Sequence, residues 1–321
     1  MPDTLLRFAV PQLAPVWLDR EATLARVVDT IEAAAREGAH AIAFGEAFVP
    51  GYPFWVSAWD GARFESAEQK ALFAHYSDQA VTIEDGHLDG VCAALARAGM
   101  AAYLGIIERP RDRSGHSLYA SYVFIGADGS IGSVHRKLCP TYEERLVWSP
   151  GDGHGLVVHK VGDFTLGGLN CWENWMPLAR AALHAQGEDL HVMGWPGGVH
   201  NTHDLTPVLA KEGRAFTVSV GGMMARADVG EGVPFAADIR TALPDVVVRG
   251  GSCVAAPDGA WLLPPQTEPG LHVVELDPAR VREARHNFDP SGHYSRPDVT
   301  ELRVDRRRQG VAAFRDAENP T

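Results

Sequence analysis

Residues 19–44 read DREATLARVVDTIEAAAREGAHAIAF, and this stretch decides the fold class. Apolar residues recur at helical spacing up to Gly38; Asp19 can cap the start of the helix, and the glycine suits a left-handed stop. The short apolar run 39–44 then predicts a strand that brings Glu46 to its carboxyl end. A helix followed directly by a strand is the repeating unit of an α/β fold.

The same alternation recurs along the chain, without a linker, repeat or low-complexity stretch that would divide it. The expected helices span 88–98 and 175–186, and the expected strands span 101–107, 118–125, 131–138, 164–169, 190–193, 216–220, 253–256, 260–263 and 271–276. Asp128 and Gly129 favour a two-residue turn between two of these strands, which would then run antiparallel. The prediction is an α/β fold with mixed sheets, in which periodicity is lost only from about residue 286.

The composition excludes several classes of partner. The chain has 321 residues, of which 45% are hydrophobic, so it can bury a large core. Its formal net charge of −12 argues against nucleic acid or an anionic membrane surface, because both attract basic proteins. No apolar run approaches the roughly 20 residues of a membrane span, and the start lacks the pattern of a leader. Four separated cysteines without a CxxC pair predict reduced thiols, so we expect a cytoplasmic enzyme.

Cys171 is the first candidate for chemistry. It lies in the run GGLNCWEN, residues 167–174, between a predicted strand and a predicted helix. The free amides and the dipole at a helix start favour a thiolate, so we expect a lowered pKa for this thiol. A free cysteine is more often a small buried hydrophobe, but the glycines before Cys171 and the polar and aromatic residues after it are poor core filler. The context favours a nucleophile at the edge of a pocket.

Glu46 and Lys137 are the candidates for a base and a cation. Aromatic and apolar residues surround Glu46 in the sequence, and loss of hydration would raise the pKa of its carboxyl, which suits a base. Lys137 lies at the end of a predicted strand, in a short basic run. Such a run usually faces solvent, but a lysine buried beside carboxylates would instead stabilise negative charge in a reaction intermediate. Glu144 is the natural second carboxylate, with Glu143 as the alternative, and either could lie on the surface.

Other catalytic patterns are missing from the sequence. It has no Gly-x-Ser-x-Gly elbow, no Walker loop, no HExxH and no strand-coupled Gly-x-Gly-x-x-Gly. His200 and His203 could bind a metal, but their loop offers no obvious third ligand, so we expect no metal and no cofactor. A catalytic cysteine–histidine pair, as in cysteine proteases, is not excluded, because the chain has 14 histidines. None of these histidines stands out by its sequence context.

Taken together, these segments resemble the nitrilase (carbon–nitrogen hydrolase) superfamily, and within it the bacterial nitrilases. The similarity extends from about residue 5 to 305, and the runs that carry it are 44–55, 136–148, 170–180, 251–253 and 287–298. The resemblance implies that Glu46, Lys137 and Cys171 form the catalytic set of the family, in the family's order along the chain. It also implies a second glutamate, which maps onto Glu144.

The resemblance further implies the architecture. We expect a four-layer α-β-β-α sandwich of the nitrilase type in one domain, residues 1–285, which associates through a helical face. Residues 286–321 would form a C-terminal arm or tail that takes part in assembly. The expected partners are a small-molecule nitrile, water and further copies of the chain, in a homo-oligomer of two or more subunits.

The expected reaction converts a nitrile into a carboxylic acid and ammonia through a thioimidate and a thioester on Cys171. Because nitrile side chains offer mainly apolar surface, we expect an apolar pocket wall, although each aromatic could equally be core. The candidates for this wall are Tyr52, Trp148, Trp172, Trp195 and Pro196. The sequence leaves open whether the nitrile is aliphatic, aryl or arylaceto.

Two kinds of alternative remain. An amidase, an N-carbamoyl hydrolase or a cyanide hydratase would use the same machinery on another substrate or stop at another product. A non-catalytic assembly protein on the same fold is the alternative from a different class, and the intact Glu46, Lys137 and Cys171 argue against it.

Overall fold

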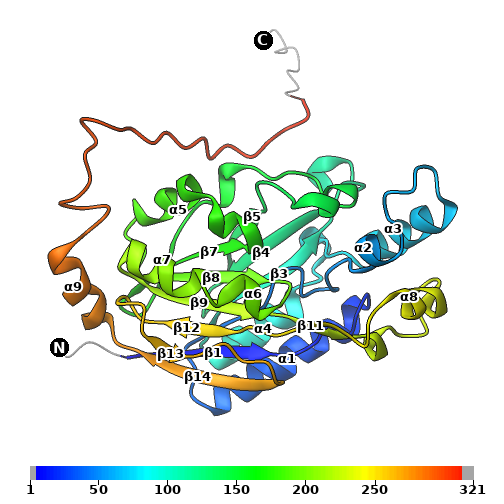
Figure 1. Cartoon of the computed structure of the whole chain (residues 1–321), viewed down its shortest axis with the longest axis horizontal. Coiled ribbons are helices and arrows are strands. Elements are labelled where there is room, and N and C mark those ends of the chain that lie inside the picture. Colours follow the sequence, from blue (N-terminus) through cyan, green and yellow to red (C-terminus); the bar gives the residue numbers. More distant parts are fainter. Residues whose placement is uncertain (1–4, 313–321) are drawn as a thin grey trace, which may run out of the picture.

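Two six-stranded mixed sheets pack face to face in the computed structural model of the chain, which describes residues 5–312 (Figure 1). The strands of the first sheet span Leu6–Gln12 (β1), Ala41–Ala43 (β2), Ala101–Glu108 (β3), Tyr119–Ile125 (β4), Ile131–Arg136 (β5) and Gly270–Leu276 (β14). Their order is β14-β1-β2-β3-β4-β5, with β1, β2 and β3 parallel and the other neighbours antiparallel.

The second sheet repeats this plan around three parallel strands. Its strands span His159–Val161 (β6), Phe164–Asn170 (β7), Leu190–Trp195 (β8), Phe216–Gly221 (β9), Cys253–Ala255 (β12) and Trp261–Leu263 (β13). They lie in the order β13-β12-β9-β8-β7-β6, in which β7, β8 and β9 are parallel. Apolar side chains of both sheets, among them Phe8 and Tyr103 on one side and Phe164 and Val192 on the other, fill the space between them.

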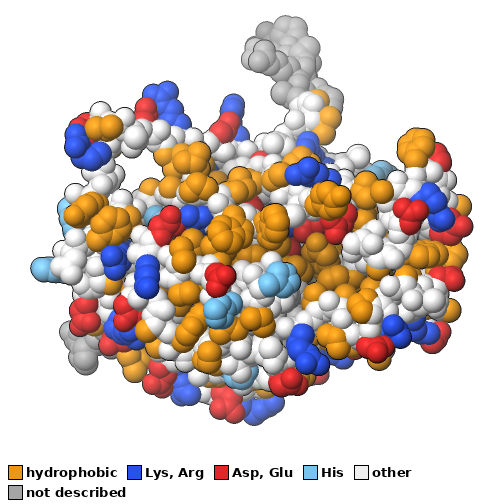
Figure 2. All heavy atoms as spheres, viewed as in Figure 1, with side chains coloured by type: hydrophobic (Ala, Val, Ile, Leu, Met, Phe, Trp, Pro, Cys, Tyr) orange, Lys and Arg blue, Asp and Glu red, His pale blue; other side chains and the backbone are white. Residues whose placement is uncertain are grey.

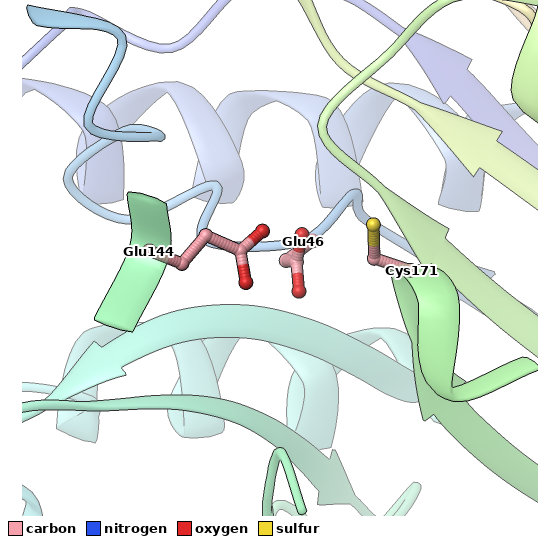
Figure 3. A group of neighbouring side chains, drawn as sticks. All are labelled: Glu46, Glu144 and Cys171. Atoms are coloured by element: carbon pink, nitrogen blue, oxygen red, sulfur yellow. The ribbon is translucent and has the colours of Figure 1, made fainter. Parts of the chain in front are cut away.

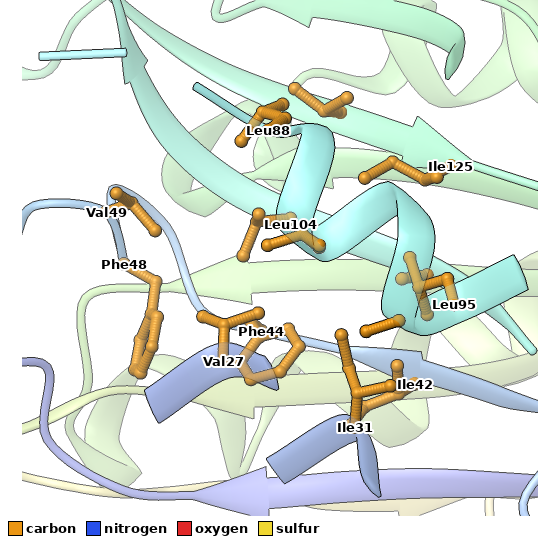
Figure 4. Close-up of a cluster of buried hydrophobic side chains, with 14 of the residues drawn as sticks. Val27, Ile31, Ile42, Phe44, Phe48, Val49, Leu88, Leu95, Leu104 and Ile125 are labelled. Atoms are coloured by element: carbon orange, nitrogen blue, oxygen red, sulfur yellow. The ribbon is translucent and has the colours of Figure 1, made fainter. Parts of the chain in front are cut away.

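Helices cover the outer face of each sheet. They span Arg20–Arg36 (α1) and Asp89–Ala98 (α4) on the first sheet, and Pro177–His184 (α5) and Leu205–Gly213 (α7) on the second. Val27 and Ile31 of α1 pack against Ile42 of β2 and Leu104 of β3 (Figure 4). Leu209 of α7 packs in the same way near β8. The predicted α/β class and the four-layer α-β-β-α sandwich with mixed sheets are confirmed.

The first helix shows how the sequence sets an element. The side chain of Asp19 accepts a hydrogen bond from the amide of Ala22 at 3.0 Å and thereby caps α1. Gly38, just past its end, takes the left-handed φ of +73° that a glycine adopts without strain. Both predicted ends of this helix are confirmed.

Several of the remaining elements gather at one end of the molecule. The remaining elements are the helices Trp55–Ala58 (α2), Ala67–Gln79 (α3), Val199–Thr202 (α6), Ala236–Ala242 (α8) and Pro278–Asn287 (α9), the strands Met223–Ala225 (β10) and Val246–Arg249 (β11), and the 3₁₀ turns Ile83–Asp85, Arg111–Arg113, Tyr142–Leu146, Gly153–Gly155, Cys171–Trp175 and Arg226–Asp228. Helices α2, α3 and α8 form lobes beside the sandwich (Figure 1). Trp55, Tyr76, Trp148 and Ile239 build a cluster of their own there.

Two local predictions were wrong. The turn between β4 and β5 comprises residues 126–130, in which the Gly126 amide donates to the Ser130 carbonyl, so it is longer than the two residues predicted. The predicted helix 175–186 begins only at Pro177, because residues 171–175 form a separate 3₁₀ turn. Strand β1, which lies between β14 and β2 in the first sheet, and helices α3 and α7 were not predicted.

The C-terminal segment has neither helix nor strand from residue 288 to 312 and arches away from the sandwich (Figure 1). Its far end is held by Arg308, which donates to Asp152 at 3.1 Å and to the Val134 carbonyl at 3.0 Å. The ends of the predicted domain and arm, residues 1–4 and 313–321, lie outside the described residues. Within residues 5–312, no helix combines the length and the apolar character needed to cross a membrane.

Candidate active site

Four predicted residues meet where the two sheets face each other. Glu46 follows β2 and Lys137 follows β5 in the first sheet, while Cys171 follows β7 in the second sheet and Glu144 lies in the 3₁₀ turn Tyr142–Leu146. One carboxylate oxygen of each glutamate and the cysteine sulfur all lie within 4.8 Å of one another. In Figure 3, Glu46 lies between Glu144 and Cys171. The fold thus brings together residues that lie far apart in the sequence.

Lys137 joins the two carboxylates. Its Nζ lies 2.7 Å from an oxygen of Glu46 and 2.7 Å from an oxygen of Glu144, and the side chain is 1% exposed. Burial lowers the pKa of Lys137, but the negative charges of Glu46, Cys171 and Glu144 more than offset this effect, so the pKa is raised. The lysine is therefore a permanent cation between the carboxylates.

Glu46 is a buried carboxylate with unused acceptor capacity. Its side chain is completely buried, and apart from the ion pair with Lys137 neither oxygen has a hydrogen-bond partner among the described residues. Burial raises the pKa of Glu46 above its ordinary value, and repulsion from Glu144 adds to the rise, while Lys137 opposes it. A carboxylate with a raised pKa and a free oxygen can accept a proton near neutral pH.

Glu144, rather than Glu143, faces this group. The carboxylate of Glu144 accepts hydrogen bonds from the Tyr52 hydroxyl at 2.7 Å and from the Thr141 amide at 2.6 Å, in addition to the bond from Lys137. It is buried, whereas Glu143 is half-buried and makes none of these contacts. Because its oxygens are engaged, Glu144 is suited to hold Lys137 in place rather than to move a proton.

Cys171 is held in a strained turn. Its φ of +49° lies in the left-handed region that side chains other than glycine rarely adopt. Asn174 donates to the Cys171 carbonyl at 2.8 Å and fixes the turn. Burial raises the pKa of the Cys171 thiol well above its ordinary value, and the charge of Glu46 adds to this, while Lys137 lowers it. The predicted lowering of this pKa by a helix start was wrong, because α5 begins only at Pro177 and the thiol is enclosed.

Glu173 is a residue that sequence reasoning did not place in the site. It is 1% exposed, and its carboxylate accepts hydrogen bonds from the backbone amides of Asn170 and Leu138 and from the ring of His135. The spacing of Asn170 and Glu173 is that of a helix capping box, in which the acid reaches back to the amide of the cap residue. That spacing was the available signal.

The five predicted wall residues lie in different surroundings. Tyr52 and Pro196 line a narrow pocket beside Glu46, of about 10 Å³, which is about the room that one water molecule needs. Trp148 lies next to this pocket. The centre of its ring is 5.4 Å from the centre of the Tyr52 ring and 5.5 Å from Nζ of Lys137. Trp195 is completely buried and Trp172 is 55% exposed; neither lines this pocket, so a contact of either with substrate stays a prediction.

The positions of Glu46, Glu144 and Cys171 could also suit a cation. The Lys137 ammonium, 2.7 Å from both carboxylates, already supplies a positive charge there. His200 and His203 belong to no such group of ligands within the part of the chain that the structure describes. The arrangement therefore offers a thiol, a base and a fixed cation, which is the equipment of covalent acyl-transfer chemistry.

Comparison with known proteins identifies the family. The family model for carbon–nitrogen hydrolases matches residues 7–286. The chain belongs to this family. The predicted resemblance is thereby confirmed, and the protein is an enzyme that hydrolyses carbon–nitrogen bonds.

Individual members of the family resemble this carbon–nitrogen hydrolase over nearly its whole length. A protein named nitrilase 2, from an unknown prokaryotic organism, is 35% identical over 96% of this chain and 95% of its own. An aliphatic nitrilase from Rhodococcus rhodochrous is 33% identical over 98% of this chain and 83% of its own. The crystal structure of an amidase from Nesterenkonia sp. has a TM-score of 0.64 at 20% identity and covers 90% of this chain and 96% of its own, which supports the common fold.

Proposed function

We propose that this carbon–nitrogen hydrolase is a nitrilase, which converts a nitrile into a carboxylic acid and ammonia. The observation that carries the proposal is the buried group in which the carboxylate of Glu46, ion-paired with Lys137, lies beside Cys171. The similarity to proteins named nitrilases over almost the whole chain supports nitriles as the substrate class.

In the first half of the reaction, Glu46 takes the proton of Cys171 while the sulfur attacks the nitrile carbon. Glu46 passes this proton to the nitrile nitrogen, and a covalent thioimidate forms. Removing the proton during the attack suits a thiol whose pKa is raised, because no free thiolate has to exist beforehand.

In the second half, Glu46 acts as a base toward water. As water adds to the thioimidate carbon, Glu46 takes a proton from it and returns the proton to the nitrogen; the carbon–nitrogen bond then breaks and ammonia leaves, so that a thioester remains. A second water molecule hydrolyses the thioester to the acid and restores the thiol. Lys137 stabilises the negative charge of the tetrahedral species, because its ammonium is fixed by Glu46 and Glu144 before the reaction begins.

The test is product analysis with Cys171→Ala on a panel of aliphatic, aryl and arylaceto nitriles. We expect the wild type to release acid and ammonia and to show a covalent adduct at Cys171 by intact mass, and the variant to do neither. Cys139→Ala is the matched control, since this cysteine is exposed and should leave turnover unchanged. Acid production by Cys171→Ala would contradict the proposal.

The same assay separates the alternatives. Release of amide as the main product would favour a cyanide hydratase type of reaction, and turnover of amides or N-carbamoyl compounds but not of nitriles would favour those hydrolases. No adduct at Cys171 with any substrate would favour the non-catalytic assembly protein.

We also propose that the enzyme works in the cytoplasm as a homo-oligomer. Free cysteines at positions 92, 139, 171 and 253 support a reducing compartment. Hydrophobic side chains gather over α5 and α7 (Figure 2), where Trp175, Leu178 and Val208 are each more than half exposed, and such a patch supports association through a helical face. Residues 286–321 are proposed as the arm that takes part in it.

A further inference from the structure

We infer that Glu173 is a positioning residue that holds the cysteine turn of one sheet and the lysine strand of the other at a fixed separation. The inference rests on the proposed function, because it assigns a task to Glu173 through Lys137 and Cys171. Glu173 itself touches neither of their reacting atoms in any contact that the structure shows.

The contacts of Glu173 reach both halves of the sandwich. One carboxylate oxygen accepts from the Leu138 amide at 2.6 Å, and the other accepts from the Asn170 amide at 3.0 Å. Leu138 directly follows Lys137, and Asn170 directly precedes Cys171. A single side chain thus links the neighbours of the cation and of the nucleophile.

The linked segments belong to different sheets. Lys137 follows β5 at the edge of the first sheet, and Asn170 ends β7 in the second. Backbone hydrogen bonds within a sheet fix each segment against its own neighbours but do not fix the first sheet relative to the second. The bonds to Glu173 supply that link close to the site.

His135 completes the arrangement. Its Nε2 lies 3.0 and 3.1 Å from the two oxygens of Glu173, so the ring faces the whole carboxylate and orients it toward both amides. Both side chains are almost completely buried. A buried carboxylate that accepts only from fixed donors has little freedom to move.

The chemistry of the acceptor explains why a glutamate is needed. Each oxygen of Glu173 faces a backbone N–H, and an amide side chain would place an NH₂ group against one of them. Glutamine therefore preserves size but loses one of the two links. Aspartate preserves the charge but is one methylene shorter, so it cannot span both amides.

The experiment compares Glu173→Gln and Glu173→Asp in the full-length enzyme, with rates expressed per folded molecule. We expect kcat to fall by about 10- to 100-fold in both variants while KM changes little, because a small displacement of reacting groups costs this much. The rate at which iodoacetamide alkylates Cys171, followed by mass spectrometry, should fall in parallel.

The pH dependence of kcat distinguishes the positioning effect of Glu173 from the effect of its negative charge. The negative charge of Glu173 contributes to the raised pKa of Glu46, so the acid limb of kcat should move to lower pH in Glu173→Gln and stay in place in Glu173→Asp. A residue that only supported the fold would lower the amount of folded enzyme and leave kcat per folded molecule unchanged in both variants, whereas a residue that acted through its charge alone would lower kcat in Glu173→Gln and not in Glu173→Asp.

Glu108→Gln is the control, because Glu108 is also buried but accepts from the side chains of Ser121 and Arg136. It should lower stability without changing kcat or the alkylation rate. Wild-type kcat and alkylation in both Glu173 variants, or an equal loss in Glu108→Gln, would overturn the inference. A wild type without nitrile turnover would instead contradict the proposed function, and the alkylation rates would still test the positioning.

Discussion

The ionisation of Glu46 follows from where its side chain lies. Burial raises the pKa of its carboxyl above the ordinary value of 4.5. The proposed base must be ionised to take a proton, so kcat/KM should fall as the pH drops through this raised pKa. We expect the acid limb of the kcat/KM profile for a nitrile to lie clearly above pH 4.5. A limb at or below that value would contradict the role of Glu46 as the base.

The neighbouring glutamates give this pH prediction a matched pair of variants. Glu144 carries a negative charge that raises the pKa of Glu46, so Glu144→Gln should shift the acid limb to lower pH. Glu143→Gln removes a charge at the adjacent position, which the structure leaves outside the buried group, and it should not move the limb. Equal shifts in both variants would show that the effect is one of net charge only.

For single residues, the sequence predicts which side chains form the site better than it predicts their pKa values. Aromatic neighbours and strand ends marked Glu46, Lys137 and Cys171 as candidates, the family resemblance grouped them as the catalytic set, and the structure brings all three together. The pKa of Cys171 could not be predicted, because its direction depends on enclosure and on a carboxylate from the other sheet. Glu173 was not predicted for the same reason, since two of the three hydrogen-bond partners of its carboxylate, Leu138 and His135, lie in a distant part of the sequence.

Among the elements, those marked by apolar spacing or by turn residues were predictable, including the short strands β2, β12 and β13, and those without such a signal were not. Helix α1 follows from its apolar spacing and from Asp19 and Gly38, which are local signals. The turn at residues 171–175 has only the capping-box spacing of Asn170 and Glu173 as a local signal, and contacts with β8 and buried side chains help to set its shape. Strand β1 is buried on both faces and lacks alternation, so a period of two does not reveal it.

The turn that carries Cys171 depends on a buried chain of polar groups. A carboxylate oxygen of Glu188 lies 2.7 Å from Nδ1 of His191, and Nε2 of the same ring lies 2.8 Å from the side-chain oxygen of Asn174. The side-chain NH₂ group of Asn174 then donates to the Cys171 carbonyl. Asn174→Ala leaves both a ring nitrogen and a carbonyl without partners. We expect unfolding free energy to fall by about 1–3 kcal/mol in denaturant titrations and kcat per folded molecule to fall as well.

Thr217→Val provides the comparison for this prediction. Thr217 is also buried and donates to a backbone carbonyl, that of Thr206 at 2.8 Å; it lies in β9 opposite His191, but its side chain makes no hydrogen bond to Glu188, His191 or Asn174. Its variant should lose stability of similar size and keep the kcat of the wild type. If kcat in Asn174→Ala were unchanged per folded molecule, the turn would not need this support.

For the whole molecule, the site depends on how closely the two sheets approach. The Glu46 amide donates to the Trp195 carbonyl at 3.2 Å and so joins the first sheet to the second beside the catalytic group. A Cβ on Gly105 would lie 2.0 Å from the Gly45 carbonyl, so this glycine permits the close packing of β3 against the segment before Glu46. Such contacts join distant segments, and for that reason residue patterns gave the α/β class, whereas the layer order came from the family resemblance.

The same scale carries the prediction for assembly. Leu178 on α5 is 67% exposed, and in the proposed homo-oligomer it would be buried by a second copy. Leu178→Asp places a charge in that interface, so light scattering after gel filtration should show a smaller species than the wild type, while circular dichroism stays unchanged. Phe64→Asp is the control, because Phe64 is 90% exposed on the segment between α2 and α3, away from α5 and α7. A monomeric wild type, or dissociation by Phe64→Asp alone, would contradict association through the α5 and α7 face.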